Sequence, residues 1–298
     1  MRLPGLFALV LPLLPLAVAA EPAGKTKGLA DCAALVATVP EITLGPKSTV
    51  EDVEGGCHAT SISYGVSSYM SYSIDSVTLL SPNLLATFPT GNIFENAELD
   101  LRGVRLKPVT HSPLQDYIIA LSTVAMNLRL AYTTDPEALT SQAEVEFSAE
   151  QLGRVAVKAS LSDFDNTDVD IDDFADLSGT LHQLDVTLED RGLFVAIFAP
   201  AVLNWLFAPD EDPTNAIMVM QETAVAALAG LPETTLSPDS LAVLGALIRA
   251  FPRPDGDWHL SFSSERGLSI KDLEDDETTV FAAILADAKI TATGEPAR

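Results

Sequence analysis

The sequence predicts an α+β fold in which a twisted, mainly antiparallel sheet is covered by a layer of about three consecutive helices. Residues 126–161 alternate apolar and polar side chains in short runs separated by turn residues, as in an antiparallel meander with one buried face. Residues 193–252 are apolar segments bounded by helix start and stop residues. Residues 257–263 then return to strand alternation. A sheet with one apolar face needs such a cover.

The chain begins with an apolar leader that predicts export. Residues 1–20 carry a single charge, Arg2, and end in the small residues Ala17 to Ala20, which suit signal peptidase. Three prolines interrupt the apolar run, which disfavours a spanning helix. We therefore expect a signal peptide over 1–20 and a periplasmic or secreted single α+β domain over 21–298. An uncleaved anchor is the alternative.

The charge balance excludes several classes of partner. The chain has 42 acidic and 17 basic residues, a net charge of −25, and 47% hydrophobic residues. Such a hydrophobic content is typical of a chain with a packed core rather than of a disordered one. The negative surface repels nucleic acid phosphates and anionic lipid headgroups. We expect no nucleic acid partner.

The two cysteines, Cys32 and Cys57, lie in the N-terminal segment 28–60. In an oxidising compartment an even pair predicts a disulfide, and closing this loop would contribute about 3 kcal/mol to stability. A thiol redox centre is the alternative, although it normally has CxxC spacing.

The predicted sheet spans residues 58–189. Strands are expected at 58–80, at 95–106 with a bulge or bend at Gly103, through 126–161, and at 184–189. The exposed faces of the central strands alternate in sign, which favours one register. Their charged residues are Arg129, Glu144, Glu146, Arg154 and Lys158.

The helical layer is predicted over 193–252. Leu193 to Phe207 is apolar except for Asn204, and Pro200 should kink it. Helices starting at Asp212-Pro213 and at Ser237-Pro238 should run to about residues 229 and 251. A short helix at 28–38, a strand at 257–263, a last helix at 274–288 and a short polar tail complete the expected elements.

The candidate ligand site lies on the first of these helices. A helix apolar on all sides is either buried or lines something apolar, and the Pro200 kink would open space beside it. The competing interpretation is a fully packed core. The residues expected to contact an apolar ligand or lipid are Leu193, Phe194, Ile197, Phe198 and Trp205.

The sequence predicts no catalytic activity and no cofactor. Familiar hydrolase, metalloprotease and nucleotide-binding motifs are missing, and the histidines His58, His111, His182 and His259 have no ligand spacing. The neighbours Asp190-Arg191 and Glu265-Arg266 are typical of surface ion pairs, although they could act as acid and base. A hydrolase assembled across the fold stays the alternative.

The acidic stretch from Asp163 to Asp176 could hold calcium, because hard cations bind clustered oxygens. Its spacing departs from an EF-hand: counted from Asp168, the glycine position holds Asp173 and the glutamate position holds Gly179. A solvated segment that deters edge-to-edge aggregation is the simpler interpretation, so no metal site is expected.

Two segments carry a resemblance to known proteins: LDVTLEDRGLF leading into helices, and FPRPDGDWHLSF returning to a strand. Over roughly residues 95–275 the chain resembles uncharacterised secreted proteins of alphaproteobacteria and, more loosely, AsmA-like envelope proteins, whose twisted sheets can hold lipid. The resemblance implies lipid handling in the cell envelope. We expect a non-catalytic envelope protein that binds an apolar ligand or lipid. The alternative is a structural or assembly factor acting through contacts with envelope proteins.

Overall fold

A computed structural model describes residues 28–68, 70–90, 94–108, 110, 112–164, 179–206, 212–269 and 287–297. The predicted signal peptide, most of the acidic stretch and most of the predicted helix 274–288 lie outside these residues. The chain divides into two compact units, one holding the residues up to Glu150 and the other those from Gln151 to Asp163 and beyond Ser178. Each unit is described by itself.

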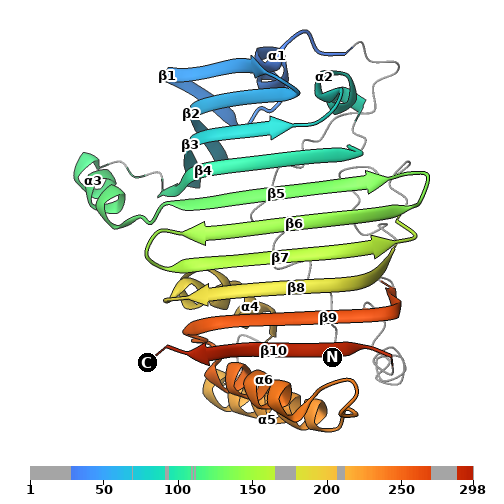
Figure 1. Ribbon diagram of the computed structural model, residues 1–298. Helices are drawn as coiled ribbons and strands as arrows, with labels where there is room; N and C mark the ends of the chain where they lie inside the picture. The colour runs from blue at the N-terminus through green and yellow to red at the C-terminus, as the bar shows by residue number, and fades with distance from the viewer. Residues whose placement is uncertain are drawn as a thin grey trace. The chain divides into compact units, whose positions relative to one another are not determined.

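The first unit is an antiparallel meander of six strands in chain order (Figure 1). Its strands are β1 (Ile42–Val53), β2 (Gly56–Ser67), β3 (Met70–Leu80), β4 (Asn96–Pro108), β5 (Met126–Asp135) and β6 (Thr140–Ala149). Its helices are α1 (Cys32–Ala37), α2 (Leu84–Thr87), α3 (Pro113–Ser122) and the 3₁₀ turn η3 (Phe88–Thr90). The meander predicted over 126–161 is confirmed here for β5 and β6, and the antiparallel sheet predicted from residue 58 is confirmed for β2 to β6.

An apolar stripe crosses the centre of this six-stranded unit. Leu101 on β4 pairs with Leu128 on β5, which pairs with Phe147 on β6. Leu128 is 4% exposed and Phe147 is 5% exposed, as the alternation predicted. On the other face Arg129 pairs with Glu146 in the register that the charges favoured, and its guanidinium also lies 3.0 Å from Glu98 on β4.

The second unit is a four-stranded antiparallel meander. Its helices lie in sequence between the second and third of these strands. Its strands are β7 (Gly153–Ser162), β8 (Thr180–Asp190), β9 (Gly256–Ser269) and β10 (Lys289–Pro296). Its helices are the π-helical turn η5 (Phe194–Phe198), α4 (Ala199–Leu206), α5 (Pro213–Ala229) and α6 (Pro238–Ala250). The predicted caps are confirmed: Asp212 accepts from the Thr214 N–H, and Ser237 accepts from the Ser240 N–H.

Helix α6 lies beside β10, as Figure 1 shows at the foot of the view. The Ile290 N–H donates to the Thr235 carbonyl at 2.7 Å, and the buried Ala292 N–H donates to Ser240 Oγ at 3.1 Å. These two bonds occupy amide groups on the edge of β10 that would otherwise template pairing with another chain. The helical segments of the predicted layer are therefore present, and one of them protects a sheet edge.

The prediction of a polar tail after residue 288 is wrong, because these residues form β10. The segment is short and mostly polar, so its alternation of Ile290 and Ala292 is weak. What makes it a strand is pairing with β9 on one side and with the start of α6 on the other.

Two further elements, β1 and α3, were not predicted from the sequence. Most residues of β1 are exposed, and Gly45-Pro46 interrupts its register with β2, so it lacks a buried alternating face. Helix α3 carries the same start signal as α5 and α6: Ser112 accepts from the Gln115 N–H, and Pro113 follows.

Candidate functional site

The predicted ligand segment lies in the four-stranded unit and is largely packed. Leu193 is fully buried, Phe198 is 8% exposed, and Phe194 and Ile197 are half-buried. The Phe194 ring lies 6.0 Å from the Phe198 ring and 5.8 Å, edge to face, from Phe251 after α6. The structure thus brings Phe194 and Phe198 together with a third aromatic ring that the sequence did not suggest. The side chain of Trp205 lies outside the described residues.

Asp190 forms the junction between β8 and this helical segment. Its side chain is fully buried, and Oδ1 accepts hydrogen bonds from the Gly192 N–H at 3.1 Å and the Phe194 N–H at 3.0 Å. These bonds satisfy amide groups at the start of the helix. Oδ2 is buried without a hydrogen-bond partner among the described residues. The Arg191 guanidinium donates to the backbone carbonyl of Asp190 at 2.8 Å and pairs with the Asp257 carboxylate at 2.9 Å.

The π-helical turn explains how the chain accommodates Pro200. A proline nitrogen carries no hydrogen and cannot bond the carbonyl four residues earlier. Directly before it, the Ala199 N–H donates to the Phe194 carbonyl, five residues back, which is a π-type bond. The sequence predicted a kink at Pro200, and the structure has a widened, π-helical turn directly before this proline.

Cys32 and Cys57 form the predicted disulfide, with a Cα–Cα distance of 5.5 Å. Both are buried in a cluster with Leu35, Leu84 and Phe94. Within the described residues, these two sulfurs and Asp52 are a set of ligand-type atoms within 4.8 Å of one another. Because both sulfurs are in the disulfide and Asp52 Oδ1 accepts from the Cys32 N–H, this set serves structure rather than metal binding.

An open cleft of about 440 Å³ lies on the six-stranded unit. Its lining residues come from β3 to β6 and the residues beside them: Asp75, Arg102, Gly103, Arg105, Ala125, Asn127, Ser148, Ala149 and Glu150. Two guanidinium groups, an amide and a hydroxyl supply donors, and two carboxylates supply acceptors.

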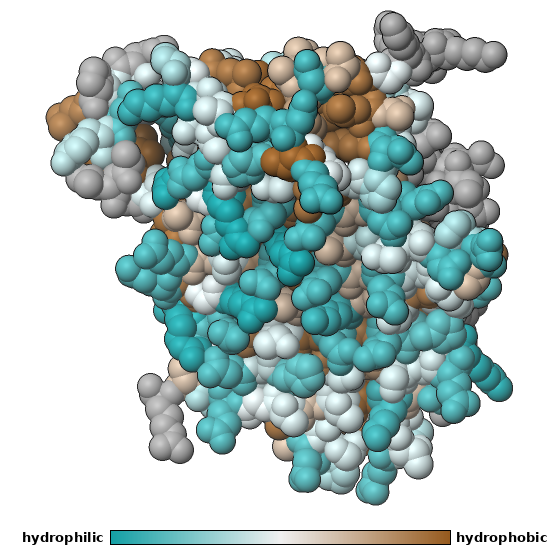
Figure 2. Space-filling view, turned by 45° about the horizontal axis from the view of Figure 1, so that its top comes forward, coloured by the Kyte–Doolittle hydropathy of each residue, from teal (hydrophilic) through white to brown (hydrophobic). Residues whose placement is uncertain are grey.

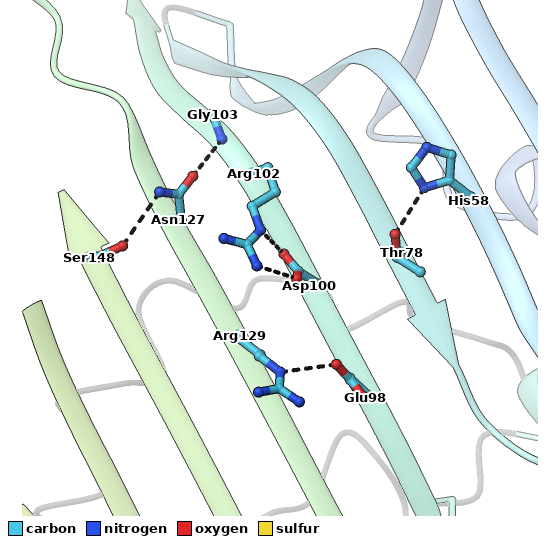
Figure 3. Close-up of polar contacts among 9 residues, drawn as sticks. All are labelled: His58, Thr78, Glu98, Asp100, Arg102, Gly103, Asn127, Arg129 and Ser148. Atoms are coloured by element: carbon cyan, nitrogen blue, oxygen red, sulfur yellow. Dashed lines mark hydrogen bonds and ion pairs between the residues drawn. The ribbon is translucent and has the colours of Figure 1, made fainter. Parts of the chain in front are cut away.

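A bulge in β4 shapes the cleft (Figure 3). Between Leu101 and Val104 the register with β5 shifts, and Asn127 Oδ1 accepts the Gly103 N–H at 3.0 Å while its Nδ2 donates to Ser148 Oγ at 3.4 Å. Gly103 has φ +63°, and a Cβ there would lie 2.0 Å from the Asp75 carboxylate. Only glycine therefore fits, which confirms the bulge predicted at Gly103.

The cleft's arginines are held by neighbouring carboxylates. Arg105 Nη1 donates to both oxygens of Asp75 at 2.8 Å. Arg102 contacts Asp100, two residues before it (Figure 3). Hydrogen bonding to Asp100 raises the pKa of Arg102. No local sequence motif predicts this cleft, because its lining residues come from separate strands. The one signal in the sequence was Gly103, which predicted the bulge in β4.

Helix α3 presents an exposed apolar surface, which we call the α3 face. Its residues Leu114, Tyr117 and Ile118 are 66%, 63% and 54% exposed. They lie at spacings of three and four residues, so they share one side of the helix. Most of the molecular face shown in Figure 2 is hydrophilic, and hydrophobic residues are concentrated in its upper part.

Comparison of the chain with protein-family models, with curated proteins and with solved structures finds no match. Within the described residues, no helix is long and apolar enough to cross a membrane. The functional argument therefore depends on the geometry of the chain itself.

Proposed function

We propose that this protein is an exported component of the cell envelope that acts as an assembly factor by binding another protein through the α3 face. The observation that carries the proposal is the exposure of Leu114, Tyr117 and Ile118 on one side of a helix. Burying such side chains against a partner contributes about 1.5–3 kcal/mol each. The disulfide between Cys32 and Cys57 supports an oxidising compartment.

The partner we propose is a protein with an apolar groove bordered by basic side chains. The chain has a net charge of −25, and the exposed Asp116 lies on α3 between the apolar positions. Like charge disfavours a second copy of the chain and an anionic lipid surface. Amphipathic helices commonly bind in apolar grooves through residues at this spacing.

Site-specific crosslinking followed by a binding measurement tests the proposal. A photoreactive side chain at Ile118 should crosslink to one envelope protein in intact cells. With that protein purified, Ile118→Ser should weaken binding about 10-fold or more, because one buried aliphatic side chain is lost.

Gln115→Ser is the matched control, since Gln115 is exposed on the same helix outside the α3 face. It should leave the dissociation constant unchanged. Equal affinities for the parent and Ile118→Ser, or binding that strengthens with added salt, would contradict the proposal. Binding to neutral lipid vesicles instead would point to a membrane surface.

A second candidate function is binding of an apolar ligand or lipid beside the segment 193–207. The π-helical turn before Pro200 and the half-buried side chains of Phe194 and Ile197 favour it. In this proposal the helices of 193–252 also cover the apolar face of the four-stranded sheet. The chain would then share a lipid-handling role with the AsmA-like proteins that it resembles. Mass spectrometry of the purified protein should then detect retained lipid.

A further inference from the structure

In the part of the chain that the structure describes, three histidines lie beside hydroxyl groups on neighbouring strands. His58 Nδ1 lies 2.9 Å from Thr78 Oγ1 (Figure 3), and His259 Nδ1 lies 3.2 Å from Thr187 Oγ1. In the four-stranded unit, His182 Nε2 lies 2.9 Å from Ser162 Oγ. Pairs of this kind are ordinary cross-strand contacts.

His182 differs from the other two because its second ring nitrogen is also engaged. Its Nδ1 lies 3.1 Å from the carbonyl oxygen of Ser264 on β9. A carbonyl oxygen only accepts, so Nδ1 carries the hydrogen. In the neutral ring, Nε2 then has a lone pair directed at the Ser162 hydroxyl, which is the arrangement of a general base with its tautomer fixed.

Two irregularities in the strands create this arrangement. The β7–β8 register passes from Ser160–Gln183 to Leu161–Leu181, so His182 is an extra residue in β8. Opposite it, the β8–β9 register skips residues 264–267. Gly267 has φ +76°, and a Cβ there would lie 2.9 Å from His182 Cε1. Bulges re-aim side chains and are enriched beside active sites.

The carbonyl that orients His182 is itself held in place. Ser264 is buried; its Oγ donates to Asp287 Oδ1 at 3.1 Å and accepts the Gly267 N–H at 2.9 Å. Asp287 Oδ2 accepts the Arg266 N–H at 2.9 Å. That backbone bond, with the Ser264 hydroxyl, holds the pKa of Asp287 below its usual range, so the carboxylate is charged at neutral pH. The orienting group therefore has supports independent of the imidazole.

We propose that His182 activates Ser162 as a nucleophile toward esters. In the first step Ser162 Oγ attacks the ester carbonyl carbon while its proton passes to His182 Nε2. The bond to the alcohol oxygen then breaks, the leaving alkoxide takes the proton from Nε2, and an acyl group remains on Ser162. Water activated by the same nitrogen releases the acid and restores Ser162.

Asp163 is the nearby alternative acceptor for the Ser162 hydroxyl, with Oδ2 3.0 Å from Oγ. When the proton has moved to the imidazole, this carboxylate favours the charged ring. The inference goes beyond the proposed assembly role, and it opposes the expectation of no catalytic activity that the sequence suggested.

Labelling with a fluorophosphonate probe tests the proposal directly. Ser162 Oγ would form a bond to phosphorus, fluoride would leave, and the proton would pass to His182. On the parent protein, peptide mass mapping should place one adduct on Ser162. His182→Gln should slow labelling about 100-fold, the lower range for general base catalysis, whereas His259→Gln should leave the rate unchanged.

Ser162→Ala should abolish the adduct, and Ser160→Ala on the same strand should retain it. Circular dichroism would verify that each variant is folded. If His182→Gln does not fold, labelling of the parent protein is the test. Ser162 that stays unlabelled in the parent after prolonged exposure to the probe overturns the proposal. Equal labelling of His182→Gln and the parent also overturns it, because Ser162 would then react without the base.

Discussion

Phe147 shows what one side chain contributes to the six-stranded unit. It is 5% exposed in the middle of an apolar stripe, opposite Leu128 on β5. A carboxylate placed there would be buried without a partner, and the contacts of the ring would be lost. The burial of this residue was read from alternation alone, and its pairing partners follow from the register.

Phe147→Asp should lower the free energy of unfolding by about 3–5 kcal/mol or more, measured by urea denaturation. Gln142→Asp is the control, because Gln142 is exposed on the same strand; its effect should stay within about 0.5 kcal/mol. A melting curve for Phe147→Asp that matches the parent's would mean that the inward face of the meander is assigned wrongly.

Glycine and aspartate decide the local geometry at other single positions. Gly103 and Gly267 occupy positive φ values of +63° and +76°, and each leaves room for a polar side chain of a neighbouring strand. Asp190 supplies the first helical turn with an acceptor that is fully buried. These residues shape sites without belonging to a local motif.

At the scale of elements, α6 and β10 support each other. The Ala292 N–H on β10 donates to Ser240 Oγ in the first turn of α6, and this bond is buried. Without this bond the Ala292 amide would be an open edge group, and open edge groups favour pairing with other chains. The helix therefore contributes to the solubility of the sheet edge as well as to its stability.

Ser240→Ala should lower the free energy of unfolding by about 1–3 kcal/mol, because the buried Ala292 amide loses its acceptor. Hydrogen exchange at Ala292 should accelerate in parallel. Thr234→Ala, at an exposed position before the same helix, is the control and should change neither quantity. Unchanged exchange at Ala292 in the Ser240 variant would show that water or another group replaces the hydroxyl.

At the scale of the whole molecule, the disulfide ties α1 to β2 across 25 residues of sequence. The cross-link restricts the unfolded chain, so its loss mainly raises the entropy of unfolding. Its surroundings are apolar, with Leu35, Leu84 and Phe94 packed against the sulfurs.

Replacing both cysteines by serine should lower the free energy of unfolding of the full chain by about 3 kcal/mol, measured by chemical denaturation. Reduction of the parent protein should give a similar loss. Mass mapping of exported protein without reductant should recover one peptide pair joining Cys32 to Cys57. Two free thiols in that material would refute the bridge.

Local signals in the sequence were enough to predict several elements of this protein. Alternation over 126–161 is a property of consecutive residues, and it located β5, β6 and β7. Cap and proline pairs at Asp212-Pro213 and Ser237-Pro238 located α5 and α6, because the first turn of a helix is satisfied by its own neighbours. The cysteine pairing followed from a count of two.

Other features depend on contacts between residues that are distant in sequence. β10 is a strand because β9 and the start of α6 supply its hydrogen bonds, and its own pattern is too short to show this. The cleft draws on four strands, and the Ser162–His182 pair needs a carbonyl 82 residues from the imidazole. Distances between such groups are set by register and bulges, which arise from pairing between strands and are not encoded in any one of them.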